Sequence, residues 1–204
     1  MNIIDLIVTF GLLIIAMTVH EFSHGWVAYQ LGDHTAANQG RLTLNPLAHI
    51  DPIGTVLLPL LLFITTHGQF VFGAAKPVPI NYWALKNPRR DVMLIGLAGP
   101  LSNILAAILL SVALSILRPV SVAALLIRDL AFINIILGIF NLIPIPPLDG
   151  SRILGGLLPP SLAQSYYKIE PYGFMILILL MAIGMLNLIV WPAVLLTARI
   201  LGIY

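Results

Sequence analysis

The chain has 204 residues, of which 59% are hydrophobic and only 9% are charged. Because a typical soluble domain has about 25% charged residues, this composition excludes a soluble protein and predicts one membrane-embedded domain over residues 1–204, with no separate soluble domain. The formal net charge of +2 is too small to indicate nucleic-acid binding, and the lack of cysteine limits any metal site to His, Asp or Glu ligands.

The first predicted element is a membrane helix over about residues 2–31, since residues 3–19 are almost wholly apolar. The segment lacks the basic region and the cleavage site of a signal peptide, so we expect it to be retained as a span. At 1.5 Å per residue, His20 would lie roughly 27 Å beyond Asn2, near the far side of a hydrocarbon core about 30 Å thick.

The sequence HEFSH at positions 20–24 places ionisable residues in this apolar helix. Positions i and i+4 share a helix face, so His20 and His24 can bind one metal ion. Glu21 follows the first histidine, where it can act as a base on a metal-bound water. The pentapeptide also allows a second interpretation, in which both histidines lie at the membrane interface, so a third ligand is needed to decide.

The next two segments are predicted not to form full membrane spans. Residues 52–66 are apolar but short and contain Pro59 near their middle, which is typical of a re-entrant or tilted segment. Residues 70–81 alternate in hydrophobicity and contain Pro77 and Pro79, which favours a short membrane-associated β-hairpin or an extended segment.

Two further spans are predicted at about residues 91–117 and 121–142, and a last apolar segment over 172–190 is predicted to be broken at positions 191–192. The first of these spans contains GPLSN at 99–103, whose small residues permit close helix packing. The predicted fold is therefore an all-α polytopic membrane protein with about four to six transmembrane segments, plus the short membrane-associated β-hairpin or extended segment near 70–81.

The span over 121–142 ends in NLIPIPPLDG at 141–150, and its three prolines cannot continue a regular helix. Non-helical backbone at membrane depth occurs only where it is buried in protein or lines a wet cavity. A stretch that ends in the carboxylate of Asp149 would suit a third metal ligand. The alternative is an interfacial turn in which Asp149 caps the following helix.

Asp149 can reach the leaflet of His20 if the first span and the span over 121–142 run parallel, which requires that residues 52–66 make no net crossing. The side of the site would then carry seven of the ten basic residues, namely Arg41, Lys76, Lys86, Arg89, Arg90, Arg152 and Lys168. The other side would carry Arg118, Arg128 and Arg199. By the positive-inside rule, we expect the site in the cytoplasmic leaflet of the cell membrane, with the N-terminus outside.

Together these motifs resemble those of the site-2 protease family of intramembrane zinc metalloproteases. The resemblance rests on HEFSH at 20–24, NLIPIPPLDG at 141–150, GPLSN at 99–103 and FGAAKPVPIN at 72–81. The PDZ and CBS domains of the family have no counterpart in this sequence, so the resemblance is to a minimal member.

The resemblance implies one Zn²⁺ per chain, with His20, His24 and Asp149 as its ligands. It also implies that Glu21 is the general base and that Asn141 positions the substrate or stabilises the oxyanion. The substrates would be single-span membrane proteins in the lipid bilayer, cleaved within or near their transmembrane helices in regulated intramembrane proteolysis.

The segment at 72–81 would hold the unwound substrate as an added strand. The alternative function is a membrane zinc carrier or metal sensor without hydrolytic activity, which would need polar groups along a path through both leaflets.

Overall fold

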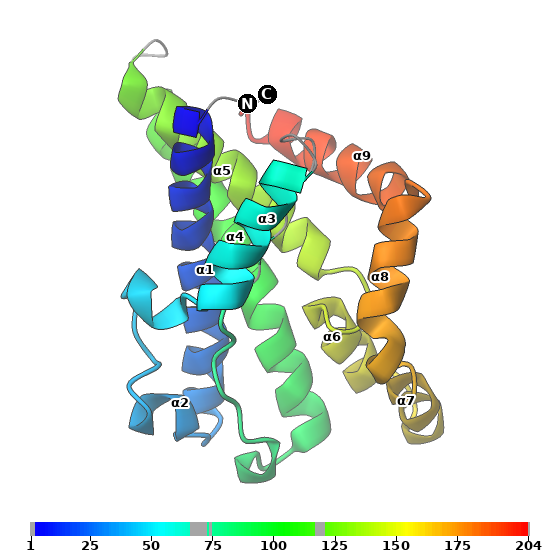
Figure 1. The fold of residues 1–204 in the computed structure, drawn as a ribbon. Coiled ribbons are helices and arrows are strands. Elements are labelled where there is room, and N and C mark those ends of the chain that lie inside the picture. Colours follow the sequence, from blue (N-terminus) through cyan, green and yellow to red (C-terminus); the bar gives the residue numbers. More distant parts are fainter. Residues whose placement is uncertain (1–2, 66–72, 74, 117–120, 204) are drawn as a thin grey trace.

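Three long apolar helices form the centre of the protein, for which we have a computed structural model that describes residues 3–65, 73, 75–116 and 121–203. They are α1 (Ile3–Gln30), α4 (Pro88–Ile116) and α5 (Val122–Asn141), and each is long and apolar enough to cross a membrane. The three helices pack side by side, with α1 and α5 running in the same direction and α4 running against them (Figure 1). This is the parallel arrangement that the proposed third ligand requires.

Shorter elements connect and flank these helices. In chain order they are α2 (Thr35–Asn38), the turn Pro46–His49, the wide helical turn Pro52–Leu57, α3 (Leu58–Thr65), the turn Tyr82–Ala84, α6 (Asp149–Leu157), α7 (Pro160–Tyr167), the turn Glu170–Tyr172, α8 (Gly173–Ala182) and α9 (Met185–Ile200).

The C-terminal helices supply at most one further span. Residues Pro160–Ala182 and Met185–Ile200 are bent by 80° at a short break, so the described residues hold three spans, or four if this pair counts as one, against the four to six predicted.

The predicted break at Trp191-Pro192 is wrong, because Pro192 lies inside α9. The chain turns instead at Gly184, whose φ of 72° is a left-handed conformation that glycine adopts without steric cost.

The segment that contains α3 begins and ends at the same level of the molecule. The backbone N–H of Lys76 donates to the carbonyl of His49 at 2.9 Å, and a Cβ on Gly73 would lie 2.7 Å from Cγ of Pro59. The chain therefore leaves this level before α3 and returns to it by Gly73. The prediction that residues 52–66 make no net crossing requires this arrangement.

The predicted β-hairpin near 70–81 is not found. No strand occurs in the part of the chain that the structure describes, and residues 75–81 have no regular secondary structure, while 70–72 and 74 lie outside the described residues. Pro77 and Pro79 have no N–H to offer a strand partner. The N–H groups of Val78 and Asn81 donate instead to side chains, the carboxylates of Glu21 and Asp33. We call residues 75–81 the site loop.

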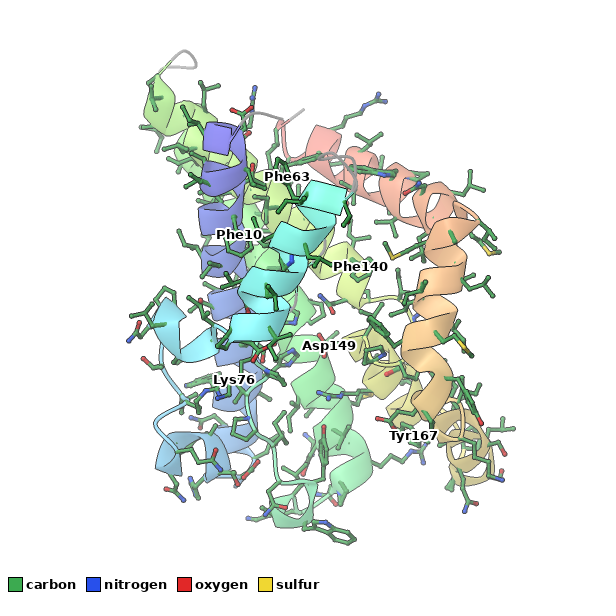
Figure 2. All side chains as sticks on the ribbon, in the orientation of Figure 1. Phe10, Phe63, Lys76, Phe140, Asp149 and Tyr167 are labelled. Atoms are coloured by element: carbon green, nitrogen blue, oxygen red, sulfur yellow. The ribbon has the colours of Figure 1, made fainter. Side chains whose placement is uncertain are left out.

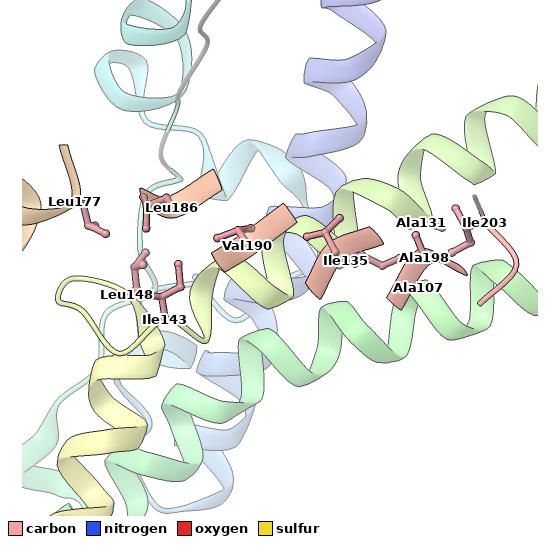
Figure 3. Packing of buried hydrophobic residues seen from close by; sticks show 11 residues of the cluster. Ala107, Ala131, Ile135, Ile143, Leu148, Leu177, Leu186, Val190, Ala198 and Ile203 are labelled. Carbon is pink, nitrogen blue, oxygen red and sulfur yellow. The ribbon is translucent and has the colours of Figure 1, made fainter. Parts of the chain in front are cut away.

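The hydrophobic core lies where the C-terminal helices pack against α4 and α5 (Figure 3). Ala107, Ala131 and Ala198 are fully buried there, and their small side chains let α4, α5 and α9 approach closely. Ile143 and Leu148, in the turn that precedes α6, belong to the same cluster. The core therefore fixes the backbone immediately before Asp149.

Asp33 anchors the C-terminal end of the site loop. Its buried carboxylate accepts hydrogen bonds from the backbone N–H groups of Thr35 at 2.9 Å and Asn81 at 2.7 Å. Burial by itself would raise the pKa of Asp33, but the hydrogen bonds from Thr35 and Asn81 outweigh it and lower that pKa below its ordinary value. The stabilisation is therefore complete above the unfolded pKa of about 3.9 and is lost as the pH falls through the folded pKa.

We expect the thermal unfolding midpoint of the wild-type protein to fall between pH 5 and pH 3 by more than that of Asp33→Asn. The measurement is a pair of unfolding curves in detergent at each pH. The exposed Asp129→Asn is the matched control and should behave as wild type. Equal losses in wild type and Asp33→Asn would show that Asp33 does not contribute.

Candidate metal centre

Three potential metal ligands from distant parts of the sequence meet in the interior. The Nε2 atoms of His20 and His24 lie 3.0 Å apart, and Oδ2 of Asp149 lies 3.0 Å from the first and 3.2 Å from the second. The three residues are 6%, 4% and 7% exposed, and Asp149 lies near the middle of the molecule (Figure 2). The structure thus brings together the three predicted ligands.

The two alternative interpretations of these residues do not fit the geometry. The histidines are buried against α4 and contact Asp149 at the start of α6, so they are not interfacial side chains at a helix end. Asp149 is the first residue of α6, the N-cap position belongs to Leu148, and no side chain caps the helix. The Asp149 carboxylate is directed at the imidazoles instead.

The hydrogen bond at Nδ1 of each imidazole determines whether its Nε2 atom faces Asp149 with a proton or with a lone pair. Nδ1 of His24 lies 2.6 Å from the carbonyl of Ile95, which can only accept, so this nitrogen carries the proton. Nδ1 of His20 makes the equivalent contact at 2.6 Å with Oδ1 of Asn103. In their neutral form both rings then direct the Nε2 lone pair toward a carboxylate oxygen. Three electron-pair donors this close, without a proton between them, need a cation.

The spacing and the free volume both fit zinc. Zinc bound tetrahedrally at 2.0–2.1 Å holds its ligand atoms about 3.3 Å apart, and the three atoms here are 3.0–3.2 Å apart. Space beside them comes from Gly99 on α4, where a Cβ would lie 2.4 Å from Nε2 of His24 and 2.6 Å from Nε2 of His20. Only glycine leaves this volume to an ion.

The candidate ligands line a cavity of about 290 Å³ together with Glu21 and Asn141. Oε2 of Glu21 accepts a hydrogen bond from the N–H of Val78 at 2.9 Å, so the site loop holds this carboxylate in place. Asn141, the last residue of α5, donates from Nδ2 to the carbonyl of Leu137 at 3.0 Å. Both predicted catalytic residues thus share one cavity with the ligands.

Sequence reasoning missed several residues of the site. Arg152, three positions after Asp149 on α6, lines the cavity, with Nη1 3.9 Å from Oδ1 of Asp149 and its guanidinium 6.0 Å from the ring centroid of Tyr82. Its i+3 spacing from Asp149 was a usable signal. Asn103 and Asn134 form a buried hydrogen bond behind His20. For Asn134 the signal was a lone amide in an apolar span, since such residues are usually functional.

Comparison with known proteins agrees with this chemistry. The profile described as "Peptidase family M50" matches residues 120–184. The "Putative zinc metalloprotease YwhC" of Bacillus subtilis is 37% identical over 189 residues, which cover 88% of this chain and 82% of that protein. The "Putative zinc metalloprotease Rip2" of Mycobacterium tuberculosis is 34% identical over 176 residues, covering 85% of this chain and 66% of the relative.

A more distant relative is the "Zinc metalloprotease MJ0392" of Methanocaldococcus jannaschii, which is 29% identical over 151 residues, or 74% of this chain and 34% of the relative. No solved structure matches the chain. The identity to the Bacillus subtilis protein extends over most of both chains and includes the region that supplies Asp149. The chain therefore belongs to peptidase family M50, the site-2 protease family, and is a membrane zinc metalloprotease.

Proposed function

We propose that the protein is an intramembrane zinc endopeptidase that hydrolyses peptide bonds within or near the transmembrane helices of single-span membrane proteins. One Zn²⁺ per chain would be held by His20, His24 and Asp149. The observation that supports this most strongly is the convergence of three lone-pair donors, buried among apolar helices, on a cavity that also contains Glu21.

Bound zinc would polarise the scissile carbonyl and lower the pKa of a water to about 7. Glu21 would accept a proton from a water molecule as the water oxygen bonds to the carbonyl carbon, and would then deliver the proton to the nitrogen as the C–N bond breaks. The products are one carboxylate end and one amine end. Asn141 and the cationic Arg152, both on the cavity wall, are placed to stabilise the negative charge that develops on the carbonyl oxygen.

The site loop is the proposed docking edge for the unwound substrate. Val78 and Ile80 line the cavity, and they alternate with Pro77 and Pro79, which have no N–H. In an extended chain, residues two apart direct their hydrogen-bonding groups to the same edge. The N–H of Val78 is donated to Glu21, so a substrate strand would pair with the backbone carbonyls of Val78 and Ile80 and the N–H of Ile80. Because a helix must first unwind to do so, helix-breaking residues near the cleavage site should favour cleavage.

The proposed orientation places the site toward the cytoplasmic leaflet of the cell membrane. Lys76 belongs to the site loop, and Arg152 lies on α6 beside the candidate metal ligands. Cytoplasmic loops carry an excess of Lys and Arg, which supports this orientation.

The test uses the purified protein in detergent and a single-span test substrate. We expect one zinc per chain by elemental analysis and cleavage of the substrate, and both should be lost in Asp149→Asn but kept in the exposed Asp129→Asn. The alternative, a zinc carrier, predicts zinc flux into liposomes without cleavage. Zinc binding together with flux and no cleavage would overturn the proposal.

A further inference from the structure

A continuous line of hydrogen bonds joins the third long helix to the candidate metal centre. Asn134 on α5 and Asn103 on α4 are 2% and 0% exposed, in the middle of apolar helices. Nδ2 of Asn103 donates to Oδ1 of Asn134 at 2.8 Å, and Oδ1 of Asn103 lies 2.6 Å from Nδ1 of His20. Asn134 itself is not in hydrogen-bond contact with His20.

The direction of each bond follows from groups that can only accept. Nδ2 of Asn134 donates to the carbonyl of Leu130 at 2.8 Å, which leaves Oδ1 of Asn134 to face Asn103. Nδ2 of Asn103 also donates to the carbonyl of Ala16 at 3.2 Å. The oxygen of Asn134 therefore faces Asn103 on α4, and the oxygen of Asn103 faces His20 on α1, so His20 must donate from Nδ1.

We propose that Asn134 is a positioning residue for the metal centre, acting through Asn103. It holds the Asn103 amide so that its oxygen faces His20, and His20 is thereby kept in the tautomer and ring orientation that direct the Nε2 lone pair at the metal. His24 needs no such device, because the backbone carbonyl of Ile95 accepts its Nδ1 proton directly. The proposal rests on the ligand role of His20 in the proposed function, not on proteolysis.

The experiment must distinguish this positioning role from a purely structural role of the two asparagines, since amide pairs also hold membrane helices together. In Asn134→Leu, Asn103 loses the shorter of its two acceptor contacts and keeps only the 3.2 Å contact to the carbonyl of Ala16, so its NH₂ group can turn toward His20 more easily. His20 would then carry its proton on Nε2, where it blocks ligation. In Asn134→Asp, the neutral carboxylic acid has the same shape, donates O–H to Leu130 and accepts from Asn103.

The experiment measures Zn²⁺ affinity of the purified full chain by competition with a chelator, and the absorption bands of the Co²⁺-substituted protein. We expect Asn134→Leu to weaken Zn²⁺ binding roughly 10–100-fold and to shift the Co²⁺ bands, as is usual for residues behind metal ligands. Asn134→Asp should retain affinity near that of wild type. Asn187→Leu, an exposed amide on α9, is the matched control and should change neither.

Wild-type affinity in Asn134→Leu, or a loss in Asn134→Asp as large as in Asn134→Leu, would overturn the proposal. Nitrogen NMR of histidine in the zinc-free wild type gives a second test that does not depend on the leucine variant folding. It should show a proton on Nδ1 of His20, which faces Oδ1 of Asn103, and an unprotonated Nδ1 would overturn the proposal. If these tests fail while the wild-type protein cleaves its substrate, only the role of Asn134 is wrong and the proposed function stands. If the wild-type protein binds zinc but does not cleave, only the proposed function is wrong.

Discussion

Replacement of Glu21 by glutamine is expected to abolish cleavage while one zinc per chain remains bound. Glu21 lines the cavity but does not belong to the group of three ligand atoms, so metal binding does not depend on its charge. The amide oxygen of glutamine can still accept the hydrogen bond from Val78, so the site loop stays in place. Only the ability to take a proton from water is removed, and general bases contribute typically 10²–10⁴-fold to rates.

The measurement for Glu21→Gln is a single-turnover cleavage rate with the single-span substrate, beside zinc content by elemental analysis. Glu170→Gln changes an exposed glutamate in the same way and should leave both values unchanged. If Glu21→Gln keeps the wild-type rate, Glu21 is not the base. If it loses zinc, its carboxylate belongs among the ligands.

Gly99→Ala is expected to remove the metal altogether. The new methyl group would lie 2.4–2.6 Å from the Nε2 atoms of His20 and His24, within the space that an ion between them needs. The backbone of α4 cannot move away easily, because a Cβ on Gly96, one turn earlier, would already lie 2.9 Å from Cβ of Arg152 on α6. We therefore expect neither zinc above background nor cleavage.

Gly11→Ala is the matched control for this change, because a Cβ at Gly11 in α1 meets nothing within 4 Å. Both variants should be purified in the folded state, and circular dichroism should show the same helix content in each. Stoichiometric zinc in Gly99→Ala, at wild-type affinity, would mean that the ion does not lie where the three donor atoms converge.

Local patterns in the sequence were enough to predict much of this site. The pairing of His20 with His24 depends only on helix geometry, since positions i and i+4 share a face. To place Asp149 beside the histidines, the prediction also needed the number of membrane crossings between them. The lengths of the apolar segments gave this number, because the segment with Pro59 is too short to span the membrane. The family resemblance then predicted the role of each residue, and the structure places all of them on one cavity.

What sequence reasoning missed depends on long-range contacts. Residues 70–81 were predicted as a β-hairpin or an extended segment from their alternation, and the hairpin is wrong. The N–H groups of Val78 and Asn81 bind the side chains of Glu21 and Asp33, which no local pattern encodes. The C-terminal break was assigned to Pro192, although a membrane helix can accommodate proline and the chain turns at Gly184. The role that we propose for Asn134 depends on its contact with Asn103, which in turn contacts His20.

The 129 residues that separate His20 from Asp149 have a consequence for biosynthesis. Translation adds roughly 5–20 residues per second, so on the order of ten seconds pass between the emergence of the histidines and that of the carboxylate. During this interval the nascent chain has only two of the three proposed ligands. With the proposed ligand set, the metal centre is therefore complete only after α4, α5 and the start of α6 have assembled against α1.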